Sequence, residues 1–225
     1  MTDSQATAAG LETAKMLLHI KAVNFRPQEP YILTSGWASP VYIDCRKVIS
    51  FTAERRRIMD LAVAQLEDKI GFANIDAVAG GETAGIPYAA WIAEATSSSM
   101  LYVRKKPKGF GRNAQIEGHM EPGSRVLLVE DLATDGASKL LFVNALRDAE
   151  AQVSDAFVVF FYGVFSGALD SLKKEGITLH YLATWRDVLQ AAEQGSHFPP
   201  ETIDGVRAFL ADPKAWSLAN GGKGE

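Results

Sequence analysis

The chain of 225 residues has one cysteine, Cys45, which excludes a disulfide framework and a zinc site built from several cysteines. No apolar run approaches the roughly 20 residues that a membrane-spanning helix needs. There is no Asn-X-Ser/Thr sequon, no internal repeat and no low-complexity tract. The first ten residues lack the basic and apolar blocks of a secretory signal, so we expect a cytoplasmic protein whose thiol stays reduced.

Charge of either sign is also modest. Lys and Arg number 23 against 27 Asp and Glu, giving a net charge of −4, which disfavours a protein that coats nucleic acid. Hydrophobic residues make up 47% and charged residues 22%, so general disorder is excluded. Because no linker divides the chain, we expect a single domain over residues 1–225.

From about residue 53 onward, apolar strands alternate with amphipathic helices. This pattern predicts an α/β fold with a parallel sheet covered on both faces. Thr184 and Asp187 resemble a capping box that opens a helix ending at Gly195. Ligands of such sheets bind beyond the carboxyl ends of the strands. The other helices are expected at about 11–23, 53–70, 85–95, 138–149 and 168–174, and the strands at about 75–79, 100–103, 125–129, 156–161 and 177–182.

The segment VLLVEDLATDGAS, residues 126–138, carries the most specific chemistry. Four apolar residues bring the carboxylates of Glu130 and Asp131 to the end of a strand. Small residues from Thr134 to Ser138 then lead into a helix, whose first backbone N–H groups suit a phosphate. The acids cannot bind that anion, so they fit ribose hydroxyls or a metal reached through water. The alternative is a turn that only caps a strand and a helix.

A second segment, AGGETAGIPYAA, residues 79–90, is rich in glycine. Gly80, Gly81 and Gly85 let the backbone approach a ligand closely, and the helix that follows favours an anion. The residues after Gly85 do not match a Walker A loop, and the glycine spacing is not GxGxxG. Taken alone, the segment is explained equally well as a tight turn.

A third segment, YVRKKPKGFGRNAQIEG, residues 102–118, has five positive charges and no acid within nine residues. Its glycines, proline and polar residues predict a long mobile loop without packed structure, and such loops are usually lids or binding loops. A solvated charged surface is the alternative. The five cations are Arg104, Lys105, Lys106, Lys108 and Arg112.

Together these segments provide two anion cradles, one acid pair and one basic lid. That combination suits a ribose carrying phosphates at two separate positions. The histidines at 19, 119, 180 and 197 are scattered and match no metal-binding motif.

On these residues the chain resembles the type I phosphoribosyltransferases and, within them, the orotate phosphoribosyltransferase family over almost its whole length. VLLVEDLATDGAS is similar to the family's signature for phosphoribosyl pyrophosphate (PRPP). LTSGWASPVYID (33–44) is similar to its orotate-side motif, GGETAGIP (80–87) to its pyrophosphate loop, and RKKPKGFG (104–111) to its catalytic loop.

The resemblance implies a central parallel sheet flanked by helices, with a small hood from residues 1–50 and the C-terminal elements over a core of about 51–195. It implies that PRPP and orotate give orotidine 5′-monophosphate and pyrophosphate in pyrimidine biosynthesis, with Mg²⁺. It also implies a homodimer whose basic loop acts in the partner's site, with no nucleic-acid or membrane partner.

Carried over by position, the resemblance implies three sets of site residues. Asp131, Arg104, Lys105 and Lys108 would be catalytic, and Asp131 would also reach the metal through water. Orotate would meet Thr134, Ser39, Tyr42, Ile43 and Thr34. PRPP would meet three of the loop cations, Arg104, Lys105 and Lys108, together with Thr83, Ala84, Glu130, Asp131, Leu132, Ala133, Thr134, Asp135, Gly136, Ala137 and Ser138.

Three positions depart from the family pattern. Thr34 replaces a lysine, and Phe110 replaces a loop histidine that could donate a hydrogen bond. No arginine follows the strand near Tyr162–Phe165, where many members have an arginine that binds the carboxylate of orotate. Arg46 is a candidate for this role. Two alternatives therefore stay open: transfer to another nucleobase, and a non-catalytic regulator that binds PRPP.

Overall fold

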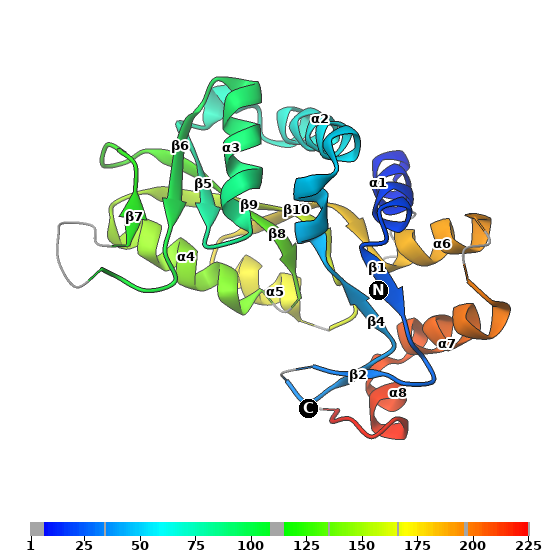
Figure 1. The fold of residues 1–225 in the computed structure, drawn as a ribbon. Coiled ribbons are helices and arrows are strands. Elements are labelled where there is room, and N and C mark those ends of the chain that lie inside the picture. Colours follow the sequence, from blue (N-terminus) through cyan, green and yellow to red (C-terminus); the bar gives the residue numbers. More distant parts are fainter. Residues whose placement is uncertain are drawn as a thin grey trace. The chain divides into compact units, whose positions relative to one another are not determined.

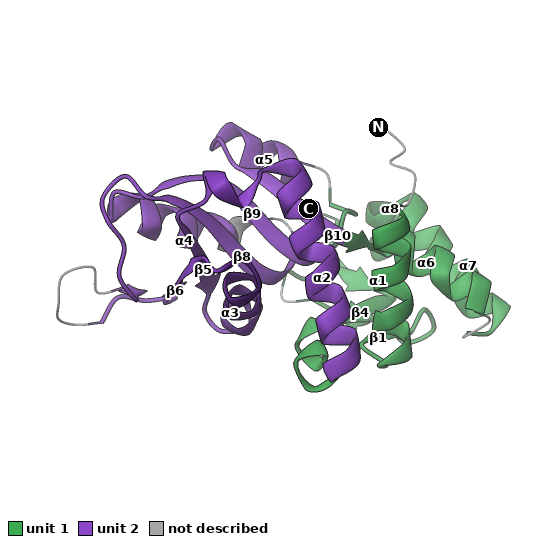
Figure 2. Ribbon diagram, turned by 90° about the horizontal axis from the view of Figure 1, so that it is seen from above, with its two compact units in different colours: residues 1–51, 162–165, 183–225 green, residues 52–161, 166–182 purple. Residues whose placement is uncertain are grey.

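A computed structural model of the chain describes residues 7–33, 35–108, 115–134, 136–165, 167–195 and 198–224, without the side chains of Ala137 and Ser138. The chain forms two compact units (Figure 2). Unit 1 comprises residues 1–51, 162–165 and 183–225, and unit 2 comprises residues 52–161 and 166–182.

Unit 2 is built on a six-stranded sheet in the order β10-β9-β8-β5-β6-β7 (Figure 1). β5 pairs in parallel with β6 and β8, β8 pairs in parallel with β9, and β7 is an antiparallel edge strand on β6. The mostly parallel sheet confirms the predicted α/β class. Its elements are α2 (Thr52–Lys69), the 3₁₀ turn η2 (Phe72–Asn74), β5 (Ala77–Gly81), α3 (Gly85–Thr96), β6 (Ser99–Val103), β7 (Ile116–Glu117), β8 (Arg125–Ala133), α4 (Ala137–Asp148), β9 (Gln152–Phe161), α5 (Ala168–Lys174) and β10 (Thr178–Thr184), whose last two residues belong to unit 1.

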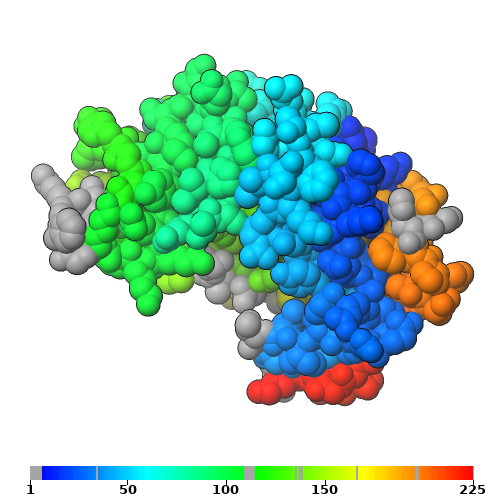
Figure 3. Space-filling view, in the orientation of Figure 1, coloured from blue at the N-terminus to red at the C-terminus, as the bar shows by residue number. Residues whose placement is uncertain are grey.

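Helices α3 and α4 cover opposite faces of this sheet. Ala77 and Ala79 of β5 pack in one apolar cluster with Phe142 of α4. A Cβ on the intervening face, at Gly80, would lie 2.7 Å from the backbone of Ile86 in α3. Because successive side chains of a strand point to opposite faces, this alternation assigns each helix to one face. Side chains of residues 52–103 cover the front of unit 2 in the space-filling view (Figure 3).

Three expected extents are corrected by the structure. The first helix, α1 (Ala8–His19), ends four residues before Val23, because Lys21 turns the chain with φ 55° and Val23 starts β1. β8 continues through the acid pair to Ala133, since it stays paired with β9 as far as Phe161. The basic segment is not wholly irregular, because β7 lies within it.

Unit 1 contains two small antiparallel pairings, β1 with β4 and β2 with β3. The predicted contact between Thr184 and Asp187 is present: Asp187 accepts hydrogen bonds from the backbone N–H and hydroxyl of Thr184, both at 2.7 Å. No helix among the described residues has the length and apolarity to cross a membrane. The elements are α1, β1 (Val23–Phe25), β2 (Tyr31–Ile32), β3 (Ala38–Ser39), β4 (Val41–Ile43), the 3₁₀ helix η1 (Cys45–Ser50), α6 (Trp185–Gly195), α7 (Pro200–Ala211) and α8 (Pro213–Ala219).

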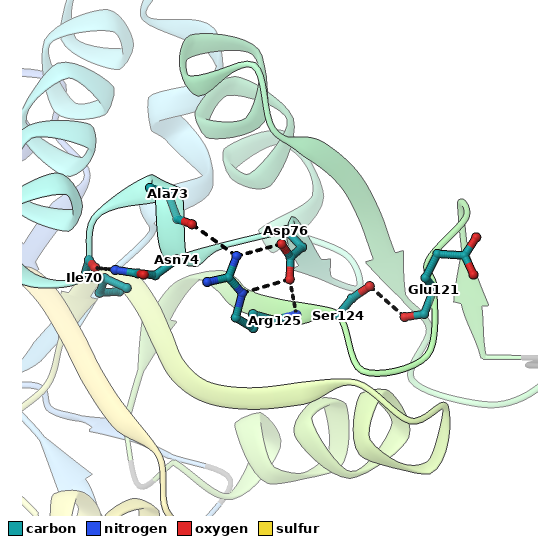
Figure 4. Close-up of polar contacts among 7 residues, drawn as sticks. All are labelled: Ile70, Ala73, Asn74, Asp76, Glu121, Ser124 and Arg125. Carbon is teal, nitrogen blue, oxygen red and sulfur yellow. Dashed lines mark hydrogen bonds and ion pairs between the residues drawn. The ribbon is translucent and has the colours of Figure 1, made fainter.

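An ion pair between Asp76 and Arg125 ties the start of β5 to the start of β8 (Figure 4). Arg125 donates Nη2 to Oδ1 of Asp76 at 2.8 Å and Nε to Oδ2 at 3.0 Å, and its backbone N–H also reaches Oδ2. Arg125 further donates to the carbonyl of Ala73. These hydrogen bonds lower the pKa of Asp76 to about 2.

We expect Asp76→Asn to lower the midpoint of urea unfolding at about pH 6. A depressed carboxyl pKa stabilises the fold above the unfolded-state value near 3.8, and the stabilisation is lost as the pH falls through about 2. The difference between wild type and variant should therefore shrink below about pH 4, be small at pH 2 and vanish at still lower pH. Asp60→Asn, an exposed position on α2, is the matched control. A difference between wild type and Asp76→Asn that is as large at pH 2 as at pH 6 would contradict the assignment.

Candidate active site

The three segments of chemical interest meet at one edge of unit 2. β5, β6 and β8 are neighbouring parallel strands, with Gly81 opposite Val103 and Gly80 opposite Val129. Their carboxyl ends therefore lie side by side, and the glycine-rich turn, the basic segment and the acid pair leave the sheet at the same edge. The topology brings together what the sequence places up to 50 residues apart.

The two acids, Glu130 and Asp131, lie on opposite faces of β8. Val126 and Leu128 pack with α4, and Glu130, in the same alternation, pairs with Lys139 of that helix. Asp131 therefore points to the opposite face of β8. It is partly exposed, whereas Glu130 is buried. The two carboxylates thus have different surroundings, which their adjacency in sequence does not reveal.

Glu130 lies in a nearly closed environment. Nζ of Lys139 contacts its Oε2, and the side chains are 4% (Lys139) and 10% (Glu130) exposed. Burial raises the pKa of Glu130, and the charge and hydrogen bond of Lys139 act in the opposite direction. Such a pair is fixed in orientation, because neither group can turn to water.

Gly81 closes the other side of this carboxylate. A Cβ at Gly81 would overlap Oε1 of Glu130 and lie 2.8 Å from a ring carbon of Phe142. Only a glycine lets the end of β5 come this close to the carboxylate.

We expect Gly81→Ala to lower kcat/KM for PRPP, the substrate that the resemblance predicts, about tenfold while the sheet remains folded, because the new methyl group must displace Glu130 or Phe142. Steady-state kinetics and circular dichroism measure the two effects. Unchanged kcat/KM in a folded variant would show that the position of Glu130 does not matter to the reaction.

The predicted phosphate cradle follows β8. Gly136 has φ 83°, a conformation that favours glycine, and as the N-cap of α4 it offers no side-chain acceptor to the first turn. The N–H groups there are thus positioned for an anion. Thr134 is partly exposed. Asp135 lies outside the described residues, as do the side chains of Ala137 and Ser138.

The basic segment leaves β6 as the stem of a hairpin. The backbone N–H of Arg104 donates to the carbonyl of Gln115 at 2.8 Å, and Nε2 of Gln115 donates back to the carbonyl of Arg104 at 2.9 Å. Glu117 on β7 accepts from Nε of Arg104 at 2.8 Å and also pairs with Lys108. Hydrogen bonds from Lys108 and Arg104 lower the pKa of Glu117. The expected loop thus has an ordered base, and residues 109–114 lie outside the description.

Glu82 joins the glycine-rich turn to this stem. Its backbone N–H donates to the carbonyl of Val103, and its Oε2 accepts from the backbone N–H of Lys105 at 2.8 Å. The side chain of Lys105 is exposed, and Thr83 and Ala84 follow in the same turn. One carboxylate therefore fixes where the basic segment leaves the sheet.

The predicted base contacts belong to unit 1. Ser39 is 1% exposed, and its hydroxyl donates to the carbonyl of Val41 at 2.9 Å; Ile43 is 2% exposed. Tyr42 is partly exposed, and its hydroxyl accepts from Arg46 at 3.4 Å. Thr34 lies outside the described residues.

The strand end that lacks the family's arginine is aromatic. The ring of Phe165 lies 5.2 Å from that of Trp37 and 6.2 Å from that of Tyr162. Burial raises the pKa of Tyr162. Arg46, beside Tyr42, is an exposed arginine whose Nε pairs with Asp44 at 2.6 Å.

Comparison with known proteins decides the family. A protein named orotate phosphoribosyltransferase from Sinorhizobium fredii is 54% identical over 211 residues, which cover 94% of this chain and 91% of that protein. The chain belongs to the orotate phosphoribosyltransferase family. No family model matched in a separate scan.

Solved structures agree with this family. Orotate phosphoribosyltransferase from Aeropyrum pernix superposes with a TM-score of 0.67 at 31% identity, covering 81% of this chain and 99% of that one. The enzyme from Mycobacterium tuberculosis in complex with PRPP gives 0.62 at 25% identity, covering 80% and 98%. The type I phosphoribosyltransferase fold expected from the sequence is confirmed.

Sequence reasoning missed three charged residues at this family's site edge: Lys139, Glu117 and Glu82. A signal for Lys139 was present, because it shares the helical spacing of Phe142, Val143 and Leu146, which are all buried. A lysine on an apolar helix face predicts a buried partner. No local pattern marks the other two, whose contacts depend on strand pairing.

Proposed function

We propose that unit 2 binds PRPP along the carboxyl edge of its sheet and that the chain transfers the phosphoribosyl group to orotate, releasing pyrophosphate. The observation that carries this proposal is one juxtaposition. The partly exposed Asp131, the uncapped start of α4 and the stem of a cationic loop all leave adjacent parallel strands. The acids suit the ribose hydroxyls of PRPP, the backbone amides suit its 5′-phosphate, and the cations suit its diphosphate.

In this proposal α4 holds the 5′-phosphate and the acids hold the ribose. Backbone N–H groups from Thr134 to Ser138 face the phosphate, where the helix dipole adds to their hydrogen bonds. Asp131 accepts from the ribose hydroxyls, and we assign the same role to Glu130, whose side chain is 10% exposed. Leu132 and Ala133 supply the backbone between these groups.

Arg104, Lys105 and Lys108 stabilise the departing pyrophosphate, with the turn at Thr83 and Ala84 beneath it. Displacement at the anomeric carbon places positive charge on the ribose and negative charge on pyrophosphate. Donors that meet this charge as it develops accelerate the step. Arg104 and Lys108 pair with Glu117 in the ligand-free chain, so they exchange this carboxylate for pyrophosphate oxygens when PRPP binds.

Mg²⁺ fits this site as a substrate-bound ion. Among the described residues no three acid, cysteine or histidine side chains converge on one point, whereas Asp131 offers the oxygen donors that Mg²⁺ prefers. Asp131 would hold the ion through water, with the substrate supplying its other oxygen ligands. Such an ion would neutralise charge on the pyrophosphate.

For orotate we carry over Thr134 with Thr34, Ser39, Tyr42 and Ile43, and we assign Arg46 to its carboxylate because Arg46 adjoins Tyr42. We further propose that residues 1–225 form one phosphoribosyltransferase domain with unit 1 as its hood. The assembly is a homodimer in which the cationic loop, whose stem begins at its own site, reaches across to serve the partner's site as well.

The test is turnover of orotate with PRPP and Mg²⁺, followed as loss of orotate absorbance, with uracil, adenine and hypoxanthine in parallel pyrophosphate-release assays. Turnover of orotate supports the proposal. Faster turnover of another base would favour an enzyme that transfers the phosphoribosyl group to that base. Tight PRPP binding without turnover of any base would favour a non-catalytic regulator.

A further inference from the structure

Lys139 stands out among the described residues as a buried lysine. It lies in the first turn of α4 with 3% of its surface exposed, and its Nζ contacts Oε2 of Glu130. No other Lys or Arg in the described part of the chain is buried. Lysine is almost never fully buried unless it is paired, so the contact with Glu130 accounts for its placement.

Stability does not explain why an ion pair stands here. Desolvating two charges offsets most of their attraction, and replacing a buried pair with apolar residues of similar volume is often neutral or stabilising. The neighbours of Lys139 on this helix face, Phe142, Val143 and Leu146, are apolar and buried, so the environment suits an apolar residue. The pair therefore calls for a role other than packing.

The geometry around Glu130 indicates that role. One carboxylate oxygen contacts Lys139 from α4, and the other lies where a Cβ at Gly81, at the end of β5, would stand. Glu130 is thereby held from two elements that border the proposed PRPP site. Lys139 is 4% exposed and its Nζ contacts Glu130, so its burial keeps it from the substrate.

We propose that Lys139 is a positioning residue for PRPP: it fixes the carboxylate of Glu130 in the orientation that accepts the ribose hydroxyls. The inference rests on the proposed function only in assigning Glu130 to the ribose. It predicts that Lys139 affects PRPP and not orotate, and that it acts entirely through Glu130.

The experiment compares wild type, Glu130→Gln, Lys139→Met and the double variant. It measures the Kd of PRPP with Mg²⁺ by calorimetry, and kcat and KM for both substrates. We expect each single variant to weaken PRPP binding about tenfold, the loss of one charge-assisted hydrogen bond. KM for orotate should change less than about twofold. The double variant should bind PRPP no more weakly than Glu130→Gln, because Lys139 has no effect without its carboxylate.

A matched control is Leu146→Ala, a buried position on the same face of α4. It should lower thermal stability and leave the Kd of PRPP unchanged, so that general loosening of the helix is separated from loss of the pair. The inference would be overturned if the double variant weakened PRPP binding by the product of the two single effects. An unchanged Kd of PRPP in a folded Lys139→Met would also overturn it.

The outcomes distinguish this inference from the proposed function. If wild type binds PRPP but does not convert orotate, the proposed reaction fails, and the four Kd values still test Lys139. If Lys139→Met does not fold, Glu130→Gln and the double variant decide: equal Kd values support the inference, and weaker binding by the double variant overturns it.

Discussion

Lys108→Ala will lower kcat about 100- to 1000-fold, the loss typical when one preorganised donor to developing charge is removed. The reason is that, in the proposed reaction, pyrophosphate gains negative charge only as the glycosidic bond breaks, and the ammonium group of Lys108 would meet that charge in the transition state. Steady-state turnover of orotate with saturating PRPP measures the effect. The fold should survive, because Lys108 is 37% exposed and Arg104 still pairs with Glu117.

Lys106→Ala is the matched control, because Lys106 is exposed, carries the same charge and lies two residues before Lys108. We expect its kcat to stay close to that of the wild type. Near-normal turnover by Lys108→Ala, or an equal loss in both variants, would refute a specific role for Lys108 and leave only the net charge of the segment.

Asp131→Asn will lower kcat/KM for PRPP about 100-fold. The amide keeps the size of the side chain but loses the charge that strengthens hydrogen bonds from the ribose hydroxyls, which are worth about 1.5–3 kcal/mol each when charged. Part of the loss should appear as a higher Mg²⁺ requirement, because a neutral amide holds a metal-bound water less strongly. Kinetics over a series of Mg²⁺ concentrations separates the two contributions.

Asp148→Asn, at the far end of α4 and exposed, makes the same chemical change away from the site. It should leave kcat/KM unaltered. If Asp131→Asn leaves kcat/KM for PRPP as unaltered as this control does, Asp131 does not bind the ribose. Its position on the face opposite Lys139 then has no role in the reaction.

The amino-acid sequence predicted much of unit 2 because its signals are local. Apolar runs separated by helical periods indicated a parallel sheet, and in unit 1 the predicted contact of Thr184 with Asp187 is present. The first helix was predicted to extend four residues too far, since pairing of Val23 with Ile43 takes that residue into a strand. Such pairing involves partners distant in sequence, which no local window contains.

The order of residues alone determined the class of fold, the family and the kinds of groups available: two acids after an apolar run, a glycine-rich turn and a cluster of cations. Only the tertiary structure decided how those groups are used. It placed Glu130 against buried Lys139 and Asp131 on the other face, and it paired Arg104 and Lys108 with Glu117. The physical reason is that charge partners are chosen by the register of neighbouring strands and by which helix covers which face, and both are properties of the packed sheet.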